Sequence, residues 1–210
     1  MRTVIYVDGF NLYFRALKNQ TYPCKWLDIQ AACIKLLSRE NVVVGMKYFT
    51  ARVSATKRDP NKALHQQIYI RALRQVTPNF EVIYGQFATH EVEKTLFTPI
   101  NGMRRAKVYE TTEKGSDVNL AVHMVNDAWR NKFDCAVLLS GDSDLAEAIR
   151  LIKANHSKKV VGVISASKTG MSKELVKECS FMRAMSRNLI ANSQMLNPIP
   201  NSNISKPVDW

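Results

Sequence analysis

The stretch from Cys135 to Leu145 places the strongest constraint on the fold, because a short apolar run ends abruptly in two acids. Residues 135–139 have the pattern of a buried strand, and a Ser-Gly step then interrupts it. Asp142 and Asp144 follow where a helix is expected to begin. In open α/β sheets, ligands bind in the crevice beyond the carboxyl ends of the strands. The stretch therefore predicts one wall of a ligand site.

Strand and helix patterns alternate along most of the chain, which predicts an α/β fold with a mainly parallel sheet and right-handed crossovers. Strand-like runs are expected at residues 3–7, 42–53, 80–87, 135–139 and 159–164. Helical patterns lie between them. One helix is expected to be capped by Ser116, which would put Asp117 in its first turn.

One segment departs from this alternation and predicts an inserted β-hairpin. Asn101-Gly102 is a strong signal for a type I′ turn, and β-prone runs flank it on both sides. The second arm of this hairpin carries Arg104, Arg105 and Lys107. These bases are candidates for contacts with a phosphate backbone, and a solvated hairpin face is the alternative for each of them.

The charge of the chain favours an anionic polymer as its partner. Its 30 Lys and Arg residues against 18 Asp and Glu residues give a formal net charge of +12. The 4 cysteines form no Cys-x-x-Cys pair, which argues against a disulfide framework or a zinc site. The N-terminal apolar run stops at Asp8, too early for a secretory signal, and no stretch approaches the roughly 18 apolar residues of a membrane span. We therefore expect a soluble, cytoplasmic protein without a membrane partner.

Length and composition predict one folded domain. With 210 residues, 46% of them hydrophobic, the chain can bury a substantial core. We expect the domain to span residues 1–191. Residues 192–210 are rich in Asn, Ser and Pro, and their composition predicts a disordered tail.

Carboxylates occur at three separate places where a strand ends or a helix begins. Asp8 ends the first strand, Asp117 opens the helix after the hairpin, and Asp142 and Asp144 follow the central strand. Each acid also has a structural interpretation, as a turn residue, a helix cap or a partner of the helix dipole. Four acids around one crevice would repel one another without a cation. We therefore expect them to hold Mg²⁺ or Mn²⁺, which take oxygen ligands and keep several waters.

Three short motifs contain these acids and occur in a defined order. They are Val7-Asp8-Gly9-Phe10-Asn11-Leu12, Lys114-Gly115-Ser116-Asp117-Val118 and Leu139-Ser140-Gly141-Asp142-Ser143-Asp144-Leu145. In that order and spacing they resemble the NYN domain family, in the LabA-like branch of the PIN-like nucleases. The resemblance covers about residues 2 to 190.

The resemblance implies a three-layer Rossmann-like fold of the PIN-like type and metal-dependent endoribonuclease activity. By this resemblance the metal-binding and catalytic acids are Asp8, Asp117, Asp142 and Asp144, and the polar accessories are Asn11 and Ser140. Near the C-terminus Ser180 stands where the family often has Asp, so no helper carboxylate is expected there.

The expected chemistry is hydrolysis of RNA phosphodiester bonds with one or two divalent ions. Lys114, next to Asp117, is a candidate for a phosphate contact. The expected partner is single-stranded or structured RNA, and association between copies of the chain stays open.

Two other functions remain open at this point. The first is a non-catalytic RNA-binding or regulatory module, because a fold does not determine its function. The second is a redox or hydroxylating enzyme, a label that some relatives in the family carry. The sequence has no Gly-x-Gly-x-x-Gly dinucleotide motif and no His-rich iron site to support this second function.

Overall fold

Two almost fully buried strands, β1 (Arg2–Asp8) and β5 (Cys135–Leu139), lie side by side at the centre of the structure. The structure is a computed structural model that describes residues 1–18, 20–22, 24–167, 172–208 and 210. Strands buried on both faces are nearly continuous apolar runs and belong in the middle of a parallel sheet. Thr3 lies opposite Cys135 and Val7 opposite Leu139, so the carboxyl ends of both strands meet at one edge of the sheet.

Within the described residues, seven strands form one sheet in the order β4-β3-β2-β1-β5-β6-β7. The other strands are β2 (Val42–Ala51), β3 (Phe80–Ile100), β4 (Met103–Lys114), β6 (Val160–Ser165) and β7 (Phe181–Ala184). Neighbouring strands are parallel except β3 and β4, which form an antiparallel hairpin. The predicted α/β fold with a mainly parallel sheet and an inserted hairpin is thus confirmed. The chain builds outward from β1 in both directions, so the topological switch point lies between β1 and β5.

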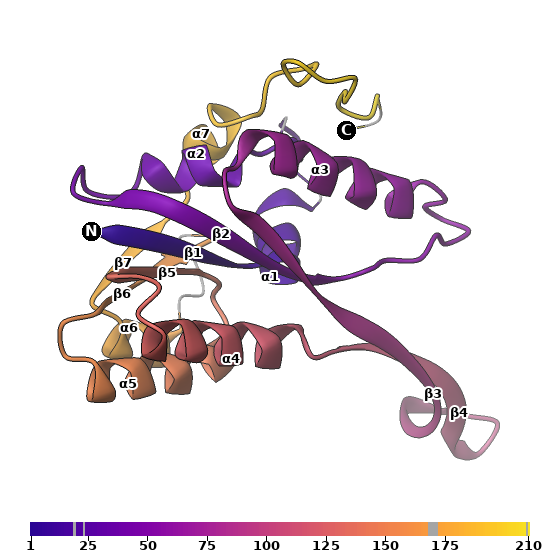
Figure 1. The fold of residues 1–210 in the computed structure, drawn as a ribbon. Helices are drawn as coiled ribbons and strands as arrows, with labels where there is room; N and C mark the ends of the chain where they lie inside the picture. The colour runs from indigo at the N-terminus through magenta and orange to yellow at the C-terminus, as the bar shows by residue number, and fades with distance from the viewer. Residues whose placement is uncertain (19, 23, 168–171, 209) are drawn as a thin grey trace.

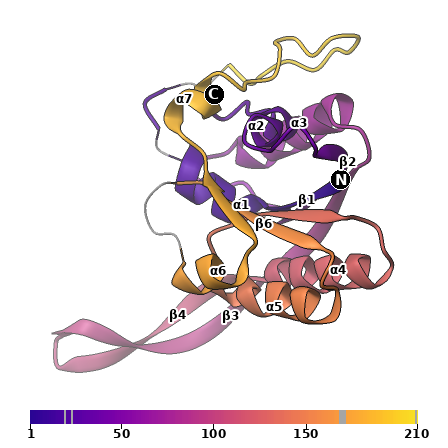
Figure 2. The ribbon, with the colours of Figure 1, turned by 90° about the vertical axis from the view of Figure 1, so that its left-hand side faces the viewer.

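Helices cover both faces of this sheet and complete three layers (Figures 1 and 2). One layer contains α1 (Gly9–Leu12), the π-helix η1 (Tyr13–Leu17), α2 (Ile29–Ile34), α3 (Lys62–Val76) and α7 (Arg187–Ala191). The other contains α4 (Ser116–Trp129), the 3₁₀ helix η2 (Ser143–Leu145), α5 (Ala146–Asn155) and α6 (Lys173–Glu178). Side chains of β1 alternate between the two apolar cores, with Ile5 and Val7 in one and Val4 and Tyr6 in the other. No helix in the described part of the chain is both long and apolar enough to cross a membrane.

The β3–β4 hairpin extends well beyond the sheet as a twisted two-stranded ribbon (Figure 1). We expected β3 to end near Phe87, but its pairing with β4 carries it on to Ile100. At the tip, Asn101 and Gly102 have φ values of 49° and 79°, as a type I′ turn requires. The predicted hairpin is therefore present, and it is longer than the sequence pattern indicates.

The start of α4 also differs from the expectation. Gly115, with a left-handed φ of 94°, is the N-cap, and Ser116 is the first helical residue. The Ser116 hydroxyl donates to Glu113 Oε1 at 2.8 Å instead of capping the helix. Glycine suits this cap because side chains are strained at positive φ. Asp117 still lies in the first turn, as predicted.

The segment after α7 packs against the core, in contrast to the disordered tail expected from its composition. It buries the apolar side chains of Met195, Ile199 and Ile204. Trp210 meets Trp26 edge-on at a centroid distance of 6.4 Å and donates its Nε1–H to His65 Nδ1 at 3.0 Å. Composition averages over the segment, so the few widely spaced apolar residues that anchor it were outweighed by Asn, Ser and Pro.

The contacts of Trp210 predict a measurable contribution to stability. Trp210→Ala should lower the free energy of unfolding by about 2 kcal/mol, less than full burial would give, because the ring is half-buried. Chemical denaturation measures this change. Leu196→Ala is the matched control, since that side chain is 68% exposed, and it should change stability by less than about 0.5 kcal/mol. Equal midpoints for Trp210→Ala and the wild type would contradict the packed arrangement.

Candidate functional site

Asp8 is held firmly at the carboxyl end of β1. Its Oδ1 accepts a hydrogen bond from the backbone N–H of Asn11 at 2.9 Å and so caps α1. Its Oδ2 accepts a hydrogen bond from Ser140 Oγ, also at 2.9 Å, and the residue is only 5% exposed. Gly9 lets the chain pass close to Tyr48, because a Cβ at this position would lie 2.6 Å from Tyr48 Cζ.

The loop after β5 is tied to the same carboxylate. Ser140 Oγ donates to Asp8 and accepts from the N–H of Asp142 at 3.1 Å, while Asn11 Oδ1 accepts from the N–H of Gly141 at 3.1 Å. The Ser140 side chain is completely buried, so it positions the acids and does not itself reach a ligand. These two polar residues therefore fix the β1 and β5 ends relative to each other.

Asp8, Asp117 and Asp142 line one open cleft of about 530 Å³, which we call the acidic cleft. They come from three segments that are far apart in the sequence, namely the end of β1, the start of α4 and the loop after β5. Asp144 is exposed outside the lining, and its N–H donates to Asp142 Oδ1 at 3.1 Å. The structure thus brings three of the predicted acids together and leaves the fourth outside the lining of the cleft.

Burial and the neighbouring acids together raise the pKa of Asp117. Burial is the largest cause that raises its pKa from 3.8 to about 6, followed by repulsion from the neighbouring acids Asp8, Asp142, Glu113 and Asp144. Burial also raises the pKa of Asp8, although the hydrogen bonds to its two oxygens oppose that rise. The cleft therefore holds carboxyl groups that a cation would stabilise in their charged form.

The donor chemistry of the acidic cleft fits a hard divalent cation such as Mg²⁺ or Mn²⁺, since its ligands are carboxylate oxygens. Across the described residues, no group of three or more His, Cys, Asp or Glu side chains is arranged to hold a metal ion. The cleft therefore does not offer a closed cage. Mg²⁺ does not need one, because it is usually held by one or two carboxylates, with water and substrate oxygens as further ligands.

Three charged residues of the cleft were not recognised from the sequence, namely Glu113, Arg15 and Lys62. Glu113 stands four residues before Asp117, but only the hairpin strand β4 shows that it faces the same cleft. Arg15 follows Asn11 by four residues, a helical spacing that could have indicated that both side chains lie on the same face and near the same cleft. Lys62, at the start of α3, has no such signal because only tertiary folding brings it there.

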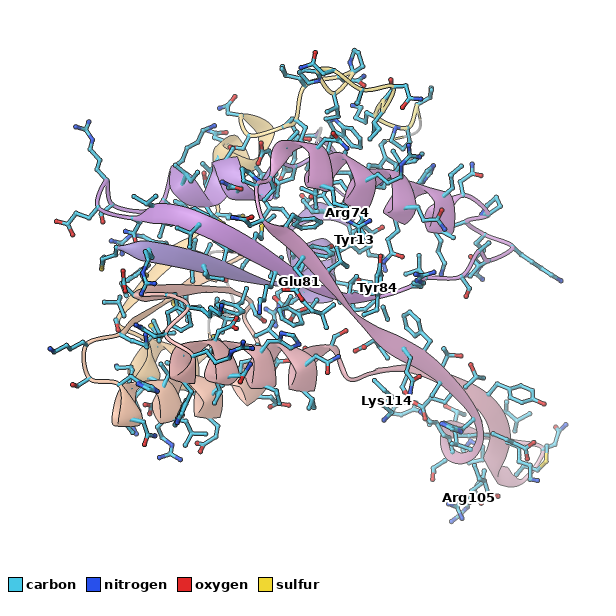
Figure 3. The ribbon with its side chains drawn as sticks, in the orientation of Figure 1. Tyr13, Arg74, Glu81, Tyr84, Arg105 and Lys114 are labelled. Carbon is cyan, nitrogen blue, oxygen red and sulfur yellow. The ribbon has the colours of Figure 1, made fainter. Side chains whose placement is uncertain are left out.

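The bases predicted to contact a substrate lie outside the lining of the acidic cleft. Arg104, Arg105 and Lys107 are on the ribbon, where Arg105 and Lys107 form ion pairs with glutamates of β3 at 3.0 and 2.9 Å. Arg105 lies far out along the ribbon, whereas Lys114 is exposed near its root (Figure 3). The sequence did not reveal these pairs because they depend on the register of β3 against β4.

Phenylalanine rings form an apolar side of the cleft. Phe10 stacks on Phe14 at a centroid distance of 6.3 Å and meets Phe87 edge-on at 5.8 Å. Phe14 is 57% exposed and Phe87 is 40% exposed. This aromatic wall offers faces on which a planar ring can stack.

The raised pKa of Asp117 can be tested by carbon NMR titration of the metal-free protein in EDTA. Asp117 should titrate near pH 6. Because its pKa is higher in the folded than in the unfolded protein, this group favours folding below about pH 4, and that contribution is lost as the pH rises through about 6. Glu113→Gln should lower the pKa of Asp117, since it removes one charge and keeps an oxygen for Ser116. Glu110→Gln, on the ribbon, should leave it unchanged, and a wild-type value near 4 would contradict the electrostatic description.

Comparisons with known proteins agree with this architecture. The chain is similar to a protein named 6-hydroxy-3-succinoylpyridine 3-monooxygenase HspA from Pseudomonas putida (strain DSM 28022 / S16), with 28% identity over 238 aligned residues, which cover 100% of this chain and 75% of the relative. A solved structure of a protein of unknown function, VPA0982 from Vibrio parahaemolyticus RIMD 2210633, has the same fold, with a TM-score of 0.58 and 19% identity over 89% of this chain and 94% of that one. The model of the NYN domain matches residues 2–186, so the chain belongs to the NYN domain family.

Proposed function

We propose that this NYN domain protein, which we assign to the LabA-like branch on its three motifs, is a metal-dependent endoribonuclease of the cytoplasm. The observation that carries the proposal is the convergence of Asp8, Asp117 and Asp142 in one cleft, where their mutual repulsion calls for a cation. The nuclease-like fold of the family supports the same chemistry. The net charge of +12 favours a polyanionic substrate.

Asp8 and Asp142 are the best candidates to hold Mg²⁺ or Mn²⁺, because Ser140 fixes both of them at the β1 and β5 ends. The ion, when bound, would lower the pKa of water and stabilise charge on the phosphate oxygens. Asp117 lies on the separate α4 side of the cleft, and its carboxylate would accept a proton from the attacking water. A cation bound at the neighbouring acids would offset the repulsion that raises the pKa of Asp117 and would favour its charged form, which is the form that accepts a proton.

The remainder of the cleft supports unpaired RNA as the substrate. Arg15 and Lys62 line the cleft beside the acids and can bind phosphate oxygens. The aromatic wall of Phe10, Phe14 and Phe87 can stack with bases that are not already stacked in a duplex. Single-stranded segments or loops are therefore the preferred substrates in this proposal.

Cleavage of labelled single-stranded RNA tests the proposal. Asp142→Asn should reduce the rate at least about 100-fold in Mn²⁺ or Mg²⁺, and EDTA should abolish cleavage by the wild type. Asp134→Asn is the matched control, because Asp134 lies at the opposite end of β5 in an exposed ion pair with Arg2. Such a pair contributes little to stability, so this variant should keep nearly full activity. Cleavage that persists both in EDTA and in Asp142→Asn would sink the proposal.

A second candidate function is suggested by the relative named as a monooxygenase of 6-hydroxy-3-succinoylpyridine. The aromatic wall can stack with a pyridine ring as well as with a nucleobase. The two functions differ in their cofactors and products. Oxygen consumption with that pyridine compound, together with a flavin or iron absorption band in the purified protein, would favour the monooxygenase. We expect RNA cleavage and no such band or oxygen consumption.

A further inference from the structure

A second cavity, of about 560 Å³, adjoins the acidic cleft, and we call it the basic pocket. It lies between the η1 region and the segment around α7, and its polar lining includes Arg15, Gln20, Tyr22, Arg187 and Asn188. Arg15 lines both cavities and therefore connects them. None of the described residues that line the basic pocket is acidic.

The charge of the basic pocket is suited to an anion. Arg15 and Arg187 bring two guanidinium groups to it from distant parts of the sequence. Arg187 is exposed, and no described acidic side chain forms an ion pair with it. Planar guanidinium groups match the oxygens of phosphate, and Gln20, Tyr22 and Asn188 can add uncharged hydrogen-bond donors.

The position of Arg15 links this anion site to the proposed chemistry. A Cβ added at Gly141 would lie 3.7 Å from Arg15 Cζ, so the guanidinium sits against the loop that carries Asp142. An anion bound by Arg15 in the basic pocket is therefore a near neighbour of a group bound at the acids. Successive phosphates along an RNA strand provide two such neighbouring anions.

We propose that the basic pocket binds a phosphate group of the RNA strand that flanks the phosphodiester bond held in the acidic cleft. The inference rests on the proposed ribonuclease function and deepens it. Arg187 and Arg15 hold this flanking phosphate, which fixes the strand so that the adjoining bond lies at Asp8, Asp117 and Asp142. The pocket thereby determines which phosphodiester bond of the RNA lies at the acids, and it makes no contact that depends on the identity of the bases.

Binding of a short unpaired RNA in EDTA tests this inference without requiring cleavage. Each phosphate in turn is replaced by a neutral methylphosphonate, and affinity is measured by fluorescence anisotropy. One replacement should weaken binding to the wild type about tenfold, because a charge-assisted contact is lost. In Arg187→Ala the same replacement should weaken binding clearly less than tenfold, since one of the two arginine partners of that phosphate has been removed and only Arg15 remains.

Arg74→Ala is the matched control, because it removes the same charge from an exposed position on α3, outside the basic pocket (Figure 3). In Arg74→Ala, the methylphosphonate at the sensitive position should still weaken RNA binding about tenfold.

If the methylphosphonate has the same effect on binding in Arg187→Ala as in Arg74→Ala, the inference is overturned even when the protein cleaves RNA. If the coupling to Arg187 is present without cleavage, the phosphate site stands and the ribonuclease proposal fails. Competition by inorganic phosphate that depends on Arg187, with no methylphosphonate effect, would identify a free-phosphate site and overturn the RNA inference.

Discussion

The hydrogen bond from Ser140 Oγ to Asp8 Oδ2 is the interaction on which the arrangement of the site depends. It joins the ends of the two central strands, which are neighbours in the sheet but more than a hundred residues apart in the chain. The same hydroxyl accepts a hydrogen bond from the backbone N–H of Asp142, so one buried oxygen joins the Asp8 carboxylate to the backbone that carries Asp142. A buried carboxylate without these donors would be costly, because burial already raises its pKa. Parallel pairing of β1 and β5 is therefore the condition for the acidic cleft as well as for the core.

The structural and functional interpretations of the acids are compatible. Asp8 caps α1 with one oxygen and accepts from Ser140 with the other, and Asp142 caps η2 while lining the cleft. Capping places each carboxylate at the point where a strand changes into a helix, and in this topology that point is the ligand edge of the sheet. A sequence pattern typical of a cap is therefore no argument against a site.

The sheet and the meeting of three acids could be predicted because both depend on local patterns, namely apolar runs that end in Asp. The surroundings of the acids could not be predicted in this way, because they depend on contacts between distant parts of the chain. Lys62 reaches the cleft through the packing of α3, and the ion pairs of Arg105 and Lys107 follow from the register of a ribbon whose length the turn signal does not specify. Similarly, the packing of Trp210 depends on a pocket built by Trp26 and Tyr69, residues distant in the chain. Local composition carries no information on such partners.

The ribbon has a consequence for the electric field around the molecule. Residues 90–112 contain four basic and three acidic residues, so this long projection contributes only +1 to the formal net charge of +12. The rest of the chain therefore carries the remaining +11, and the ribbon is almost electrically neutral. The charge of the body therefore provides most of the long-range attraction of a polyanion and determines how this attraction depends on ionic strength. The ribbon projects far from the body, but with a net charge of only +1 it contributes little to the long-range attraction of a polyanion.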